Sequence, residues 1–177
     1  VERRRCAVGP RRARYVKRAA LTVLCAVACG APTPGGIGRV GVALSGTTDT
    51  VRFEVPVVAT MCADGAGVLV HGERRGQGLL VWLRGGAPPD TGTYPLLTRG
   101  DTAATSGAVV SVRFMVGDVA HGVTLDDGDA TVVGATPQLE LQVRGRGVET
   151  GLAGQRSAEL ALEHVTLEPD TVSCRLL

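Results

Sequence analysis

Three histidines, at positions 71, 121 and 164, are the side chains of this sequence that could serve as general bases at neutral pH. His71 and His121 each precede a glycine, whereas His164 lies within a stretch of alternating residues. A hydrolase would need one of them beside a nucleophile and an orienting acid. The sequence contains no Gly-x-Ser-x-Gly elbow that would expose a serine nucleophile. We therefore predict no catalytic residue, and a secreted hydrolase that uses His121 or His71 remains an alternative.

Three acidic residues, Asp126, Asp127 and Asp129, surround a glycine at position 128. Hard cations such as Ca²⁺ prefer several carboxylate and carbonyl oxygens, and such a segment could supply some of them. The twelve-residue spacing of an EF-hand loop is absent, however. Asp-Gly also suits an ordinary hairpin turn, because both residues tolerate positive φ. We interpret the segment as a turn and predict no metal site and no cofactor.

Three of the five cysteines, Cys29, Cys62 and Cys174, lie within residues 29–177. If Cys29 is modified, an even pair remains, and in an oxidising compartment such a pair forms a disulfide. A Cys62–Cys174 bridge would close a loop of about 113 residues, which the chain-entropy model values at roughly 4–5 kcal/mol. Two unpaired thiols are the alternative. Metal binding is a weak interpretation, because the pair lacks a Cys-x-x-Cys spacing.

An apolar segment at Ala19–Ala28 follows the basic residues. A helix of about ten residues reaches only about half of a hydrocarbon core, so this segment is too short to span a membrane. Small residues, Ala26 and Ala28, stand just before Cys29. A positive flank, a short apolar core and small residues at its end are typical of a secretory signal. The flank consists of Arg11, Arg12, Arg14, Lys17 and Arg18.

The segment Ala26-Val27-Ala28-Cys29 resembles the lipobox of bacterial lipoprotein precursors, with Ala26 where that family usually carries Leu, Val or Ile. The resemblance implies that Cys29 is diacylated and becomes the new N-terminus after cleavage. Residues 1–28 are then a signal peptide region with a signal helix, and residues 29–38 a Gly/Pro-rich tether on the outer side of the membrane. An ordinary cleaved signal and an uncleaved membrane anchor are the alternatives. The implied location is the bacterial cell envelope, extracytoplasmic and lipid-anchored, either in the periplasm or at the cell surface.

The charge of the chain changes sign after the signal region. Residues 29–177 hold 11 basic and 16 acidic residues, a formal charge of −5, although the whole chain carries +2. A net acidic domain argues against nucleic acid as a partner, because binding to phosphate backbones needs a basic face. These 149 residues are enough for one substantial core.

Alternation of apolar and polar residues dominates the chain from Arg39 onward. Period-two alternation with one apolar face is typical of half-buried antiparallel strands. The segment Leu79–Leu83 is apolar on both faces and predicts a central strand. Turn signals occur at Asp64-Gly65, Asp127-Gly128 and Gly145-Arg146-Gly147. We expect about eight to ten strands, near residues 39–46, 49–59, 66–72, 78–84, 92–97, 106–117, 129–134, 138–145, 156–166 and 170–176.

Short strands separated by turns predict an all-β fold. We expect residues 39–177 to form an antiparallel β-sandwich, immunoglobulin-like or jelly-roll-like. The order of a lipobox cysteine, a tether, a Gly92–Leu96 turn and a late strand resembles small bacterial lipoproteins of unknown function with a β-sandwich domain.

These features together favour a non-catalytic binding or structural module. Its predicted partners are the membrane, through the lipid anchor, and a protein or glycan. Besides the hydrolase, an adhesin or assembly subunit that pairs edge strands with a neighbour is an alternative.

Overall fold

The computed structural model describes residues 35–44, 48–63, 65–150 and 155–174. The predicted signal helix within residues 1–28 and the predicted lipid site Cys29 lie outside these residues. All regular elements among the described residues are β-strands. They are β1 (Gly36–Ala43), β2 (Thr50–Cys62), β3 (Gly67–Arg74), β4 (Gln77–Arg84), β5 (Gly92–Pro95), β6 (Gly107–Val116), β7 (Val119–Gly134), β8 (Gln138–Glu149) and β9 (Gln155–Val172).

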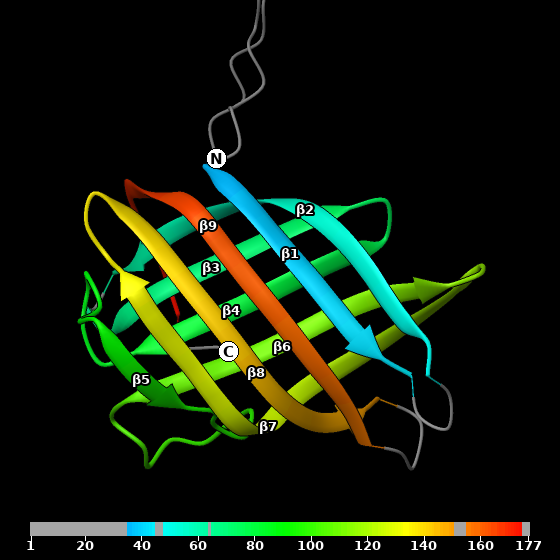
Figure 1. Cartoon of the computed structure of the whole chain (residues 1–177). Coiled ribbons are helices and arrows are strands. Elements are labelled where there is room, and N and C mark those ends of the chain that lie inside the picture. Colours follow the sequence, from blue (N-terminus) through cyan, green and yellow to red (C-terminus); the bar gives the residue numbers. More distant parts are fainter. Residues whose placement is uncertain (1–34, 45–47, 64, 151–154, 175–177) are drawn as a thin grey trace, which may run out of the picture. The chain divides into compact units, whose positions relative to one another are not determined.

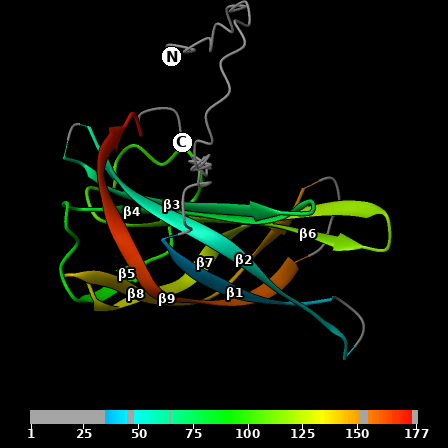
Figure 2. The same cartoon turned by 90° about the horizontal axis from the view of Figure 1, so that it is seen from above.

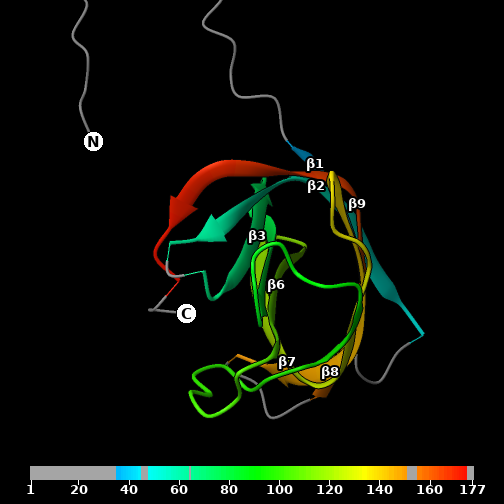
Figure 3. The same ribbon diagram turned by 90° about the vertical axis from the view of Figure 1, so that its left-hand side faces the viewer.

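Eight of these strands form a closed antiparallel barrel (Figure 1). Around the ring the order is β7-β6-β4-β3-β2-β1-β9-β8, and pairing between β7 and β8 closes it. The expected β-sandwich is therefore wrong, whereas the all-β prediction is confirmed. Alternation shows that a strand has one buried face, but it does not show whether that face packs on a second sheet or faces the inside of a closed one. Figure 3 shows the strands surrounding a common interior.

The interior is filled by the apolar residues that the alternation identifies. Phe114, Leu83, Leu125, Leu139 and Leu141 are the largest of the fully buried apolar side chains. One core cluster contains inward-facing residues from all eight ring strands. It also contains Tyr94 of β5 and Leu96, which follows that strand. An eight-stranded ring is just wide enough for side chains to fill it. The barrel is thus a packed core, and polar groups that could meet a partner lie on its outer wall or at its ends.

The long strand β7 is the element that the sequence predicted least well. Asp127 and Gly128, expected in a turn, lie within this strand, where the register against β8 shifts between Leu125 and Asp127. The first half of β7 pairs with β6, and its second half pairs with β5. The strand expected near residues 92–97 is present as the short β5, although the same Gly92–Leu96 segment was also interpreted as a turn.

The last strand, β9, changes partners along its length. From Ser157 to Glu163 it pairs antiparallel with β1, and beyond the start of β1 it pairs in parallel with the end of β2. The Sγ atoms of Cys62 and Cys174 lie 2.02 Å apart in this region, as in the disulfide that the sequence predicted. The bridge therefore closes the rim of the barrel where β2 and β9 meet directly. Strand β1 itself begins at Gly36, inside the predicted 29–38 tether.

Two glycines of the expected Gly145-Arg146-Gly147 turn instead allow β8 to approach its neighbours. A Cβ atom on Gly147 would lie 1.8 Å from the carbonyl oxygen of Thr124 on β7. One on Gly145 would lie 2.4 Å from Cδ1 of Leu96. The glycines are needed for close contact within a continuous strand rather than for a change of direction.

Candidate functional site

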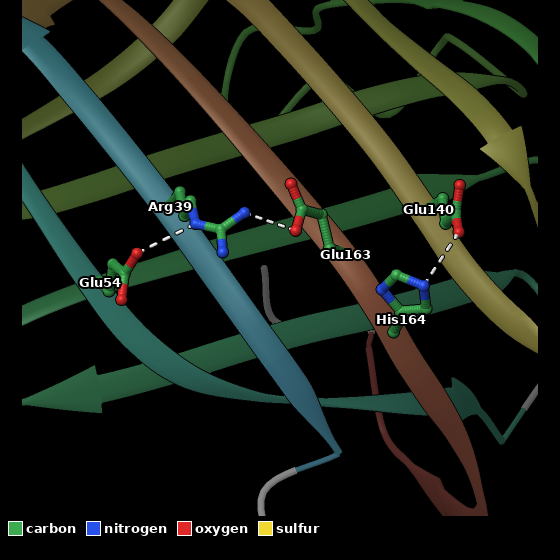
Figure 4. Close-up of polar contacts among 5 residues, drawn as sticks. All are labelled: Arg39, Glu54, Glu140, Glu163 and His164. Atoms are coloured by element: carbon green, nitrogen blue, oxygen red, sulfur yellow. Dashed lines mark hydrogen bonds and ion pairs between the residues drawn. The ribbon is translucent and has the colours of Figure 1, made fainter.

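A ladder of charged side chains crosses the outer wall of β2, β1 and β9 (Figure 4). Arg39 on β1 donates from Nε to Oε1 of Glu54 on β2 over 2.9 Å, and its Nη1 pairs with Glu163 on β9. Register explains the arrangement, because the Cα of Arg39 lies opposite that of Glu54. The hydrogen bonds that Arg39 donates to Glu54 and Glu163 raise the pKa of Arg39 above its ordinary value. All three side chains are about half exposed, so they form a polar surface rather than a buried site.

A β-bulge in β9 places His164 on the same wall. Leu139 pairs with Val165 and Leu141 pairs with Leu162, so two residues of β9 oppose the single Glu140 of β8. His164 has a positive φ of 54°, and its Nε2 lies 3.8 Å from Oε1 of Glu140. The bulge brings Glu163 and His164 to the outer surface as neighbours in sequence, where Figure 4 shows both.

The first groove on the outer wall, which we call the β1–β9 groove, encloses about 530 Å³. Its floor includes the small residues Gly41 and Ala161, and its sides carry Arg52, Arg144 and Glu159. Arg144 lies 3.8 Å from Glu159, measured between Nε and Oε1. Most of the charge in this groove is therefore already paired across neighbouring strands.

The second groove, which we call the β4–β6 groove, encloses about 510 Å³. Its lining includes residues of β4 and β6, strands that lie across the barrel from β1 and β9 (Figure 2). Its charged and ionisable lining residues are Arg99, Arg113, Glu73 and His121, and three hydroxyl side chains lie beside them. These hydroxyl residues are Ser111 on β6, Thr124 on β7 and Thr150 after β8. Its composition, rich in hydrogen-bond donors, differs from that of the first groove.

A buried polar cluster occupies the end of the barrel where β8 ends and β9 begins. Glu149 is the only buried charged residue of the described chain, with 1% of its surface exposed. Its Oε1 pairs with Nδ1 of His121 on β7, and its Oε2 accepts from Nε of Arg156 on β9. The His121 ring also stacks on Phe114, with centroids 5.3 Å apart. Three strands are thus joined through one carboxylate.

The electrostatics of this cluster favour an ionised Glu149. Burial alone raises the pKa of the carboxyl group, but the hydrogen bonds from His121 and Arg156 and the charges of these two residues outweigh it. The pKa of Glu149 is therefore lowered from its ordinary value of 4.5. A carboxylate held in this way is suited to stabilising the barrel end, and it also orients the His121 ring.

The structure separates the other residues that the sequence selected. His71 is exposed on β3, which β4 and β6 separate from β7 and its His121. Asp126, Asp127 and Asp129 are exposed on β7, and Oδ2 of Asp127 accepts from Nη2 of Arg146 over 2.6 Å. Among the residues described, no group of three or more His, Cys, Asp or Glu side chains is placed to hold a metal ion.

Sequence reasoning missed Glu149 and Arg156. The signal was available, because alternation from Leu139 through Leu141 and Val143, continued six residues further, reaches Glu149 at an inward position. The prediction ended that strand at residue 145 because glycines follow. A charged residue at an inward position is the feature that marks a buried polar cluster.

No helix long and apolar enough to cross a membrane occurs in the described part of the chain. No family model matches the chain, and neither a curated protein nor a solved structure matches it. Its function must therefore be inferred from its own residues.

Proposed function

We propose that the chain is an extracytoplasmic module of the bacterial cell envelope, anchored by lipid on Cys29, that binds a partner without chemical turnover. The Ala26–Cys29 lipobox pattern and the basic, apolar leader before it support the anchor. The Cys62–Cys174 pair supports an oxidising compartment, because structural disulfides persist outside the cytosol.

The observation that carries the binding role is the distribution of polar groups over the barrel. The interior is packed with apolar side chains, and the two grooves of about 530 and 510 Å³ lie on the outer wall. Grooves of this size with a few placed polar groups are typical of ligand sites. Pairing through edge strands, as in an adhesin or assembly subunit, has less to support it, because each of the eight ring strands is paired on both sides.

The anchor is tested by replacing the proposed lipid site and a matched cysteine of the leader. We expect Cys29→Ser to leave the protein unacylated and to release it from washed membranes or stop its processing. Cys25→Ser removes a cysteine four residues earlier and should leave membrane association unchanged. Equal membrane association and equal acylation of both variants and the parent chain would contradict the proposal.

A second function, hydrolysis, is favoured by one observation, the pairing of His121 with Glu149. A base oriented by a carboxylate is half of a catalytic triad. The missing half is the nucleophile: the described hydrogen bonds link no Ser, Thr or Cys side chain to His121.

An esterase and glycosidase screen distinguishes the two functions. Turnover that is lost in His121→Ala and retained in His71→Ala would favour the hydrolase. No turnover, or turnover that both variants retain, would favour the binding module.

A further inference from the structure

We infer that the β4–β6 groove is a binding site for the phosphate group of a small phosphorylated sugar or polyol. This inference rests on the proposed binding function and assigns it a place and a ligand class. The charge, the donor groups and the shape of the groove each support it.

The position of Arg113 supplies the central argument. On one side its Cα lies opposite Gly78 of β4, and on the other side opposite Gly122 of β7. Both cross-strand neighbours therefore lack a side chain, and Arg113 is exposed. The next side chains along this row are Glu73, opposite Gly78, and Thr150, beside Gly122. Cross-strand neighbours are the usual partners of a charged side chain on a sheet. An arginine whose two cross-strand neighbours are glycines has no partner at these positions and can bind a ligand.

The state of the charges distinguishes this groove from the β1–β9 groove. There, Arg39 and Arg144 are paired with glutamates on neighbouring strands, and only Arg52 is outside the ion pairs of the described residues. The ion pairs found among the described residues include neither Arg99 nor Arg113. These two arginines outnumber the single carboxylate of the β4–β6 groove, Glu73, so the local excess of positive charge favours an anion.

The second arginine comes from the β5–β6 connection, which is held against the barrel. The amide of Leu97 donates to the carbonyl of Ala108 over 2.8 Å. Nη1 of Arg84 donates to the carbonyl of Asp101 over 2.6 Å. These contacts lie on both sides of Arg99, so this residue is positioned at the groove by its flanking backbone.

Hydroxyl groups complete the donor set. Ser111 and Thr124 are cross-strand partners with Oγ and Oγ1 3.2 Å apart, and both line the groove. The amide of Thr150 donates to the carbonyl of Gly122 over 2.8 Å, which fixes this third residue beside Arg113.

The number of donors selects the ligand. The bond between Ser111 and Thr124 uses one hydroxyl proton, so two guanidinium groups and two hydroxyl protons remain as donors. A phosphomonoester presents three strongly accepting oxygens to such a set, whereas a carboxylate presents two. Guanidinium groups also match phosphate in a two-point geometry. A groove of about 510 Å³ leaves room for a body the size of a sugar or polyol beside the phosphate.

The test is a titration of the ¹⁵N-labelled full chain in detergent, followed by two-dimensional NMR. Glucose 6-phosphate is the probe, with glucose as the neutral control and glucuronate as the carboxylate control. We expect glucose 6-phosphate to shift the amide signals of Gly78, Gly122 and Thr150 in a saturable way, glucuronate to bind at least tenfold more weakly, and glucose to cause no shift.

Three variants locate the site. Arg113→Gln should raise the dissociation constant at least tenfold, and Arg146→Gln, which removes the same charge from the outer wall of β8, should leave it unchanged. Gly122→Val should fill the groove with an apolar side chain and leave the charge unchanged. The fold should tolerate the substitution, because a Cβ at this position meets only Oγ1 of Thr150, at 3.8 Å. Signals remote from the groove report whether each variant is folded.

Three results would overturn the inference: no saturable shifts at the groove, equal binding of glucuronate, or equal effects of Arg113→Gln and Arg146→Gln. None of them bears on the envelope anchor, which depends on the modification of Cys29. Failure of this inference and failure of the proposed function can therefore be distinguished.

Discussion

Glu149 and Arg156 are joined by an ion pair inside one end of the barrel, where 1% of the carboxylate side chain and 13% of the arginine side chain are exposed. They lie on β8 and β9, on either side of the connection between these strands. The other carboxylate oxygen pairs with His121 of β7. One side chain thereby links three consecutive strands, including the β7–β8 pair that closes the ring.

Replacing this carboxylate tests its structural role. Glu149→Gln keeps the shape of the side chain but leaves Arg156 in the barrel end without a counter-charge. Removing one partner of a buried ion pair is strongly destabilising, so we expect the free energy of unfolding to fall by about 3 kcal/mol. Urea unfolding of the variant and of the parent chain measures the difference. Glu54→Gln, which breaks an exposed pair with Arg39, is the control and should barely move the midpoint.

The same carboxylate predicts how stability depends on pH. The pKa of Glu149 is lowered in the folded state, so the unfolded chain binds its proton more readily than the native protein does. The stabilisation is therefore complete above the ordinary value of 4.5 and is lost as pH falls through the lower folded value. We expect the stability difference between the parent chain and Glu149→Gln to shrink as pH falls below about 4.5. A difference that grew below this pH would contradict this assignment.

The disulfide offers an independent test at the opposite end of the barrel. Cys62 and Cys174 are separated by 112 residues and fasten the parallel pairing of β2 with β9. In the chain-entropy model, a Cys62→Ala/Cys174→Ala double variant loses about 4–5 kcal/mol. We expect a lower thermal midpoint, measured by circular dichroism.

Reductant supplies the control for this prediction. It should lower the midpoint of the parent chain and leave that of the double variant unchanged. If reductant lowered the midpoints of both proteins equally, the bridge between Cys62 and Cys174 could not be the source of the stabilisation.

The sequence predicted the strands better than it predicted their closure. Alternation within a strand depends on local burial, and in the strand expected at residues 106–117 the alternating residues Val110, Val112 and Phe114 are buried. Closure depends on the pairing of β7 with β8 and of β1 with β9, which joins Val40 to Leu160 across most of the chain. Local periodicity contains no information on such pairings, so a sandwich and a barrel give the same pattern.

The candidate sites were predicted only in part, because they too depend on how strands continue and pair with one another. The cysteine pair follows from counting, and His121 was selected as an ionisable residue. Its partner Glu149 was missed because the Gly145 and Gly147 region was interpreted as a turn, although the strand continues through it. The openness of Arg113 depends on glycines of two neighbouring strands, which only the register reveals.

Glycine substitutions test the close approach of β7 and β8 that closes the ring. Gly147→Ala would place a Cβ atom 1.8 Å from the carbonyl oxygen of Thr124 and 2.6 Å from the Cα of Leu125. The backbones would have to separate, and we expect a loss of about 2–3 kcal/mol of stability in urea unfolding. Gly41→Ala is the matched control, because its Cβ would meet its nearest neighbours at 3.6 and 3.9 Å. It should change stability by no more than about 0.5 kcal/mol.

The intact mass of the protein extracted from membranes tests the central proposal, an anchored and disulfide-closed barrel, most directly. We predict the mass of residues 29–177 plus the added acyl chains, less the two hydrogens lost when the disulfide forms. A species that retains the residues before Cys29, carries no acyl mass and has both thiols reduced would contradict the account.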